Sequence, residues 1–333
     1  MKPLVSVVVP MFNEEGNVAG LMNRFDAIVA ANPAHRFEFV VVDDGSTDGS
    51  TDAVRLQASQ RSNLKCVVLS RNFGSHYALS AGLQHCEGDV AVIVGADAQE
   101  PIDLVARMLQ TWQEGHEIVW GIREQRADQG RVSRFISGLF SRLLRKYSVL
   151  KSYPAEGPSA FLLDRLVIDV VNRLTEHNRN VAGLLAWSGF RQGRVTFRQL
   201  ERASGQSKWT GKAKIKLAVD SFVEFSFTPI RFVTFSGVAV AAVGFAYAAF
   251  LVARRLFFSD IASGWTTVVV VALLLGGFQL VVLGVLGEYI WRGIEESRGR
   301  PLFIVREVVA SSTPEDSAVE WAQPPEAPSD GDP

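Results

Sequence analysis

The sequence predicts an α/β fold in which a mainly parallel sheet is followed by a two-helix transmembrane hairpin. Three observations predict it. Short β-branched runs alternate with stretches of helical length over the first third of the 333 residues. Polar side chains gather where those runs end. Two long ranges without charged residues follow after residue 229.

The composition excludes several classes of protein. A hydrophobic content of 47% argues against a disordered chain, and a net charge of -1 gives no general attraction to nucleic acid, so no nucleic-acid partner is expected. Cys66 and Cys86 are too few for the disulfide framework of a small secreted protein. The N-terminus reaches Asn13 and Glu14 after a short apolar stretch, which is not typical of a signal peptide.

The predicted strands come first in the chain and are separated by helical segments. Segments of helical length include Glu15–Ala31 and Ile102–Glu114. A strand–helix–strand repeat of this kind implies a parallel sheet with helices on both faces. The five apolar runs that we expect to be strands are 4–12, 37–45, 64–70, 90–97 and 117–122.

The two uncharged ranges are each long enough to span a bilayer as a helix. Residues 232–253 form a range of 22 and residues 265–287 a range of 23, and a helix needs roughly 20 residues to cross. Lysines and arginines flank the pair on the outer sides, which predicts an integral membrane protein with two spans and with the sheet domain and both termini in the cytoplasm. The alternative is a pair of buried helices in a soluble protein.

Four predicted strands end in unusual polar runs, at 10–15, 43–50, 70–74 and 95–101. Ligands bind beyond the carboxyl ends of parallel strands, so we expect a site where these runs meet. Carboxylates there need a partner such as a ribose hydroxyl, a base N–H group or a divalent cation. For any one run taken alone, turn and helix-cap chemistry is the alternative.

These runs resemble those of the family 2 glycosyltransferases of the polyprenyl-phosphate type, which include the dolichyl-phosphate mannose synthase and undecaprenyl-phosphate enzymes. The resemblance covers residues 4 to about 306 and rests on PMFNEE, VVDDGSTDGS, SRNFGSHYALSAGL, the 97–101 run, GIREQR, ERASGQSKWT and GEYIWRGIEESRGRPLFIV. It implies a GT-A-like sheet domain that binds a nucleotide sugar. It also implies inverting transfer of a single sugar to a polyprenyl phosphate at the cytoplasmic face of the membrane.

The resemblance also implies which residues bind the donor. Asp43 or Asp44 would meet the base or the ribose. Arg202 and Lys208 lie in a glycine-containing loop that would close over the diphosphate. The full set of implied donor-binding residues is Pro10, Phe12, Asn13, Glu14, Asp43, Asp44, Arg202 and Lys208.

A divalent metal, Mg²⁺ or Mn²⁺, is implied as cofactor. The family usually carries an Asp-x-Asp motif at the fourth strand end, and here Gly95 stands at its first position. Asp97 and Gln99, with Glu100 nearby, would hold the ion, since Mg²⁺ is commonly bound by one or two carboxylates plus substrate oxygens and water. Asp97 is therefore expected to be catalytic.

The acceptor phosphate is expected to meet basic residues after the fifth strand. Between Arg123 and Lys146 there are seven basic residues against two acidic ones, and apolar residues recur there with helical spacing. This helix could lie at a bilayer surface or pack on the sheet. The resemblance favours Arg123, Arg134 and Ser137 as phosphate ligands, with both arginines catalytic.

The expected domain organisation follows from these parts. A glycosyltransferase domain spans 1–211, an amphipathic interfacial segment 212–228, the hairpin 229–291, a cytoplasmic return segment 292–309, and a disordered acidic, proline-rich tail 310–333. Glycines in the second span would also permit a homo-oligomer. Two other functions stay open: transfer to another glycan or lipid acceptor, and a non-catalytic membrane-bound protein that binds nucleotide sugars.

Overall fold

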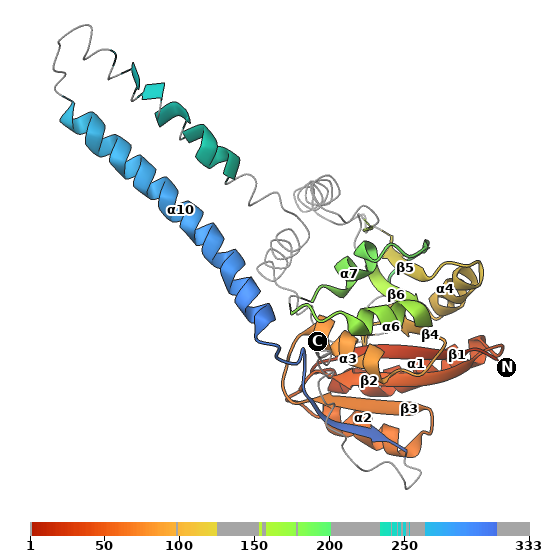
Figure 1. Ribbon diagram of the computed structural model, residues 1–333. Coiled ribbons are helices and arrows are strands. Elements are labelled where there is room, and N and C mark those ends of the chain that lie inside the picture. The colour runs from red at the N-terminus through yellow and green to blue at the C-terminus, as the bar shows by residue number, and fades with distance from the viewer. Residues whose placement is uncertain are drawn as a thin grey trace, which may run out of the picture.

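The computed structural model contains an eight-stranded sheet in the order β7-β5-β6-β4-β1-β2-β3-β8 (Figure 1). Its strands are β1 Leu4–Met11, β2 Arg36–Asp43, β3 Leu64–Leu69, β4 Val90–Ile93, β5 Ile118–Arg123, β6 Pro158–Asp164, β7 Gln192–Phe197 and β8 Val305–Ala310. The structure describes residues 2–97, 99–124, 153–154, 158–177, 179–200, 234–240, 242–244, 246–247, 249–250, 253 and 264–311.

The helices lie between these strands, and one long helix precedes the last strand. They are α1 Val18–Ala31, α2 Ser50–Gln60, α3 Ser75–His85, α4 Asp103–Gln113, α6 Arg165–Arg173, α7 Val181–Trp187 and α10 Trp265–Ser297, with a short 3-10 turn at Glu15–Asn17 before α1. All five predicted strands are present, with bounds that differ by a few residues from those expected.

Most strands of the sheet point the same way. β1 pairs in parallel with β2 and β4, β2 with β3, and β5 with β7, while β6 and β8 run antiparallel to their neighbours. The predicted mainly parallel α/β sheet is therefore confirmed. The carboxyl ends of β1 to β5 and β7 consequently lie at one edge, which is called the carboxyl edge below.

The core lies on both faces of the sheet because the central strands are apolar on both sides. On β1, Val5, Val7 and Val9 pack against α1, α2 and α4, whereas Val8 faces α3, α6 and α7 on the other side. Strands buried on both faces read as continuous apolar runs, which explains why the sequence pattern revealed them.

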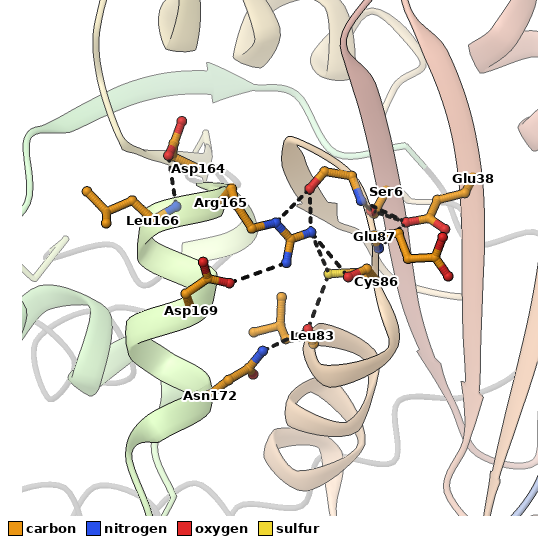
Figure 2. Close-up of polar contacts among 11 residues, drawn as sticks. Ser6, Glu38, Leu83, Cys86, Glu87, Asp164, Arg165, Leu166, Asp169 and Asn172 are labelled. Carbon is orange, nitrogen blue, oxygen red and sulfur yellow. Dashed lines mark hydrogen bonds and ion pairs between the residues drawn. The ribbon is translucent and has the colours of Figure 1, made fainter.

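The end of α3 far from the carboxyl edge is held by side chains from other elements (Figure 2). Arg165, at the start of α6, donates from Nη2 to the carbonyl of Cys86 at 3.1 Å and from Nε to the carbonyl of Gly88 at 2.9 Å. On the β1 side, Ser6 accepts from the Gly88 amide at 2.8 Å. A cation that caps the carbonyls of a helix C-terminus stabilises it, so α3 is fixed at its base while its N-terminus reaches the carboxyl edge.

The transmembrane hairpin is the part of the fold prediction that is wrong. In the described part of the chain, no helix has both the length and the apolar character that crossing a bilayer demands. The first predicted range, 232–253, is described only in short runs, the longest being 234–240. The second, 265–287, lies in α10, which continues through Glu295 and Glu296. This finding overturns the prediction of an integral membrane protein with two spans and with the catalytic domain and both termini in the cytoplasm.

After residue 287 the chain completes α10 at Ser297 and then adds the last strand of the sheet, β8. The N-terminal end of α10 lies far from the sheet, and its C-terminal end meets the sheet domain, where Glu296 Oε2 accepts from the His177 amide at 3.0 Å (Figure 1). β8 then pairs antiparallel with β3 and ends at Ala310.

Candidate functional site

At the carboxyl edge, the loop after β1 is hydrogen-bonded to the loop after β2. The Asn13 amide donates to Ser46 Oγ at 2.9 Å, and Asn13 Oδ1 accepts from the Thr47 amide at 2.8 Å. The Glu14 amide donates to Ser50 Oγ at 2.8 Å. Asn13 has φ +53°, a left-handed conformation that asparagine tolerates better than most residues. Strain of this kind is typical of functional loops and persists because the neighbouring loop fixes it.

The paired acids after β2 are buried and hold the loops around them. Asp43 accepts from the Ser46 amide at 3.2 Å and from Thr51 Oγ1 at 2.5 Å, which closes the turn that leads into α2. Asp44 accepts from the amides of Phe73 and Gly74, at 2.8 and 2.9 Å, and so joins the loop after β2 to the loop after β3. Burial raises the pKa of Asp44, and the two amide donors oppose that shift.

Asp43 and Asp44, to which the resemblance assigns donor binding, thus already accept hydrogen bonds from the protein itself. An ionised carboxylate offers about four acceptor positions, so Asp44 retains capacity beyond its two amide bonds. Pro10, Phe12, Asn13 and Glu14 lie in or directly after β1, beside these acids. The structure thus brings the described members of the predicted donor set together at one edge.

Gly45 lets the loop after β2 approach the loop after β3 closely. It has φ +67°, and a Cβ built there would lie 2.4 Å from the carbonyl carbon of Arg71 and 2.7 Å from the Asn72 nitrogen. Since these are backbone atoms, the contact cannot be relieved by turning a side chain.

Replacing Gly45 by alanine should therefore destabilise the fold by about 2–4 kcal/mol, the sum of left-handed strain and overpacking. Gly20→Ala is the matched control, because Gly20 lies in α1 with open space around it and alanine favours a helix there by about 0.5–1 kcal/mol. Urea unfolding of both variants measures the two changes, which should have opposite signs. Equal stabilities would show that the loops are not locked together.

Arg71 is a site residue that sequence reasoning did not single out. Its guanidinium carbon lies 4.0 Å from the centroid of the Phe73 ring, and its charge lowers the pKa of Asp44. The side chain is exposed at the end of β3. The sequence predicts that the 70–74 run lies at a strand end, but the effect of the Arg71 charge on Asp44 depends on the neighbouring positions of β2 and β3.

The fourth strand end brings two carboxylates over Gly95. A Cβ built on Gly95 would lie 2.9 Å from Asp97 Oδ1 and 3.4 Å from Glu100 Oε1. The two side chains therefore fill the space that a larger residue at position 95 would need. This is a physical reason for glycine at the place where the family motif usually has its first aspartate.

Glu100 is engaged on its other side by a buried arginine. Arg24 on α1 lies with Nη1 3.4 Å from Glu100 Oε2, and its Nη2 donates to the Glu100 carbonyl at 2.7 Å. Both side chains are almost fully buried. Burial raises the pKa of Glu100; Arg24 opposes this shift and Asp97 adds to it. Glu100 is thus held by Arg24, whereas the side chain of Asp97 is only partly buried.

Gln99 and Arg123 are joined through a residue that the sequence did not indicate. Gln199, two residues after β7, donates from Nε2 to Gln99 Oε1 and accepts from Arg123 Nη1 at 2.9 Å. The predicted metal ligand Gln99 and the predicted phosphate ligand Arg123 consequently belong to one hydrogen-bonded group. β7 was not among the expected strands, so its neighbours could not be foreseen.

Several predicted site residues lie outside the described residues. These are Arg134, Ser137, Arg202 and Lys208, together with the amphipathic helix expected over 132–144. Among the residues that are described, no group of three or more His, Cys, Asp or Glu side chains is arranged to hold a metal ion. Asp97 and Gln99 nevertheless offer the oxygen atoms that Mg²⁺ and Mn²⁺ prefer.

A family model for glycosyl transferase family 2 matches residues 6–180, which begin in β1 and end just before α7. The chain belongs to glycosyl transferase family 2. The matched range contains the described donor residues, Gly95, Asp97 and Arg123, so the resemblance read from the motifs is confirmed. The protein is a glycosyltransferase.

Relatives of known name span nearly the whole chain. The uncharacterised glycosyltransferase YkcC of Bacillus subtilis (strain 168) is 33% identical over 301 residues, 90% of this chain and 93% of its own. A bactoprenol glucosyl transferase of Shigella phage SfV is 33% identical over 302 residues, 91% of this chain and 98% of its own. This family 2 chain therefore matches its relatives well beyond the range of the family model.

Solved structures of glycosyltransferases are similar as well. A mannosyltransferase of Pyrobaculum calidifontis in complex with GDP-Man and Mn²⁺ is 16% identical, with a TM-score of 0.43 and coverage of 85% of this chain and 88% of the other.

Proposed function

We propose that this family 2 glycosyltransferase transfers one sugar from a nucleotide-diphosphate sugar to a polyprenyl phosphate, with inversion at the anomeric carbon. The observation that carries the proposal is the match to a bactoprenol glucosyl transferase over 91% of this chain and 98% of that protein. The arrangement of the carboxyl edge supports it, because acidic and basic side chains suited to a donor and an acceptor lie there side by side.

The main requirement of this reaction is that the protein neutralise the negative charges of the lipid phosphate and the donor diphosphate. A lipid monophosphate has a second pKa of about 6 and is mostly a dianion at neutral pH, so no general base is needed. One phosphate oxygen forms the new bond to the anomeric carbon. The bond from that carbon to the diphosphate breaks, and its electron pair leaves with the nucleoside diphosphate. Attack from the face opposite the leaving group inverts the centre.

The residues divide between the two substrates. Pro10, Phe12, Asn13, Glu14, Asp43 and Asp44 would bind the nucleotide, with Arg202 and Lys208 on the diphosphate. Arg71 joins this group, since an arginine fork suits a phosphate oxygen. Arg123, with Arg134 and Ser137, would bind the acceptor phosphate and bring it to the sugar.

The donor diphosphate also calls for a cation. Asp97 and Gln99 would hold Mg²⁺ or Mn²⁺, with the remaining ligands from the diphosphate and water. When bound, such an ion stabilises the charge that develops on the departing diphosphate. Glu100 is committed to Arg24 and is not counted as a ligand.

A transfer assay tests the proposal directly. The purified protein is incubated with a panel of labelled nucleotide sugars, undecaprenyl phosphate and Mn²⁺, and labelled product is extracted into organic solvent. We expect lipid-extractable label with one donor, sensitive to mild acid as a sugar phosphodiester is, and none when undecaprenyl phosphate is left out.

Two other results would contradict the proposal in different ways. Label that appears only with a different acceptor would indicate another glycan or lipid substrate. A donor that raises the unfolding temperature but gives no product with any acceptor would indicate a non-catalytic nucleotide-sugar-binding protein, for which Gly95 in the metal motif is the structural argument.

A further inference from the structure

Gln199 lies between two residues that the proposed function assigns to different substrates. Its Nε2 donates to Gln99 Oε1, and its Oε1 accepts from Arg123 Nη1 at 2.9 Å. The backbone around it is fixed to the same two loops. The Leu200 amide donates to the Gln99 carbonyl at 2.9 Å, and the Glu124 amide donates to the Phe197 carbonyl at 2.8 Å.

The chemistry of the partners fixes which way the Gln199 amide faces. A guanidinium only donates, so the oxygen of Gln199 must face Arg123. The NH₂ group of Gln199 then points to Gln99, and the Gln99 oxygen must turn toward it. A carboxamide can both donate and accept in this position, whereas an ionised carboxylate cannot donate and an aliphatic side chain can do neither.

We infer that Gln199 is a positioning residue that orients the Gln99 amide and the Arg123 guanidinium relative to each other. It touches neither substrate and acts through these two residues. The inference rests on the proposed function, in which Gln99 serves the donor side and Arg123 the acceptor side. Gln199 thereby fixes where the acceptor phosphate is held with respect to the cation on the donor diphosphate.

The test compares Gln199→Leu with a matched variant at the other end of β7. Gln192 accepts a hydrogen bond from Trp120 Nε1 at 2.9 Å, far along the strand from the carboxyl edge, so Gln192→Leu removes a similar bond without reaching the site. We expect Gln199→Leu to lower kcat/KM for transfer by about 10- to 100-fold, as partners of ligating residues commonly do. Gln192→Leu should leave it unchanged.

Two further readouts separate positioning from a general structural effect. The first is the affinity for Mn²⁺ alone, measured from the EPR signal of the free ion. This affinity should be lower in Gln199→Leu than in the wild type and unchanged in Gln192→Leu. The second is the KM for undecaprenyl phosphate in an Arg123→Met background, where adding Gln199→Leu should change it much less than in the wild type. Coupled residues show such non-additivity, and independent ones do not.

The outcomes distinguish this inference from the proposed function. A wild-type protein that makes no lipid product refutes the proposed function, while the Mn²⁺ measurement still tests Gln199. Equal Mn²⁺ binding in wild type and Gln199→Leu, no Mn²⁺ binding by the wild type, or fully additive effects with Arg123→Met would each overturn the inference. Similar behaviour of the two leucine variants would also overturn it.

Discussion

Asp97→Asn should reduce sugar transfer by about 100-fold or more while leaving the fold intact. The change keeps the size of the side chain and removes its charge. In the structure, Asp97 is the partly exposed carboxylate of the pair over Gly95, whereas Glu100 is paired with Arg24. Loss of the charge that Asp97 would contribute to a bound cation removes stabilisation of the leaving diphosphate, an effect typically worth several kcal/mol.

Initial rates over a range of Mn²⁺ concentrations measure this effect. Asp103→Asn is the matched control, since Asp103 starts α4 close by and pairs at 3.0 Å with Arg107 on the protein surface. That variant should transfer sugar at the wild-type rate. If Asp97→Asn kept more than half of the activity, the placement of the metal and the assignment of Asp97 as catalytic would both be wrong.

Arg24→Met should destabilise the protein by about 3–5 kcal/mol, the usual effect of removing one partner of a buried ion pair. The loss arises because Glu100 is left charged and buried beside Asp97. Arg61→Met is the control: Arg61 pairs at 2.7 Å with Asp26, whose side chain is 62% exposed, and surface pairs contribute about 1 kcal/mol or less. Urea unfolding at neutral pH measures both.

The pH dependence of this loss identifies its cause. Arg24 lowers the pKa of Glu100, so its removal should raise that pKa further above the unfolded value. A carboxyl whose pKa is raised in the folded state loses stability as the pH rises through that value. The deficit of Arg24→Met should therefore be smaller in acid than at neutral pH, and Glu100→Gln in the same chain should recover part of it. A deficit independent of pH would point to lost packing instead.

The sequence could predict the central sheet because its strands are buried on both faces. Runs such as 4–12 and 37–45 can be recognised without their neighbours in the sheet, since every residue in them except Glu38 is apolar or small until the strand ends. The donor side of the site follows from the same logic, because parallel strands deliver their last residues to one edge. Asn13 and Asp44 could thus be placed together without a structure.

The edges of the sheet could not be predicted in this way. β7 is half-exposed, with Val195 and Phe197 directed inward and Arg194 and Thr196 outward, and β8 alternates similarly. This period-two pattern was present in the sequence, but each run is only six residues long. The contacts of Gln199 with Gln99 and Arg123 require β7 to lie beside β5 in the sheet. The local pattern of apolar and polar residues does not encode this order of strands.

The hairpin prediction failed for a different reason. Hydropathy along the chain predicts that residues 232–253 and 265–287 span a membrane. Among the described residues, however, no helix is both long enough and apolar enough to do so. The sequence shows that position 95 is glycine but not why. The reason lies in the structure, where Asp97 Oδ1 and Glu100 Oε1 lie 2.9 and 3.4 Å from a Cβ built at that position.

The last strand of the sheet has a consequence for how the polypeptide matures. Among the described residues, the outer neighbour of β3 is Val305–Ala310, which also brings Glu307 to Arg55 on α2. A nascent chain on the ribosome therefore exposes the outer backbone edge of β3 until Val305–Ala310 has been synthesised. Unpaired strand edges recruit other chains, so a chain interrupted before Val305 should aggregate more readily than one that contains this strand.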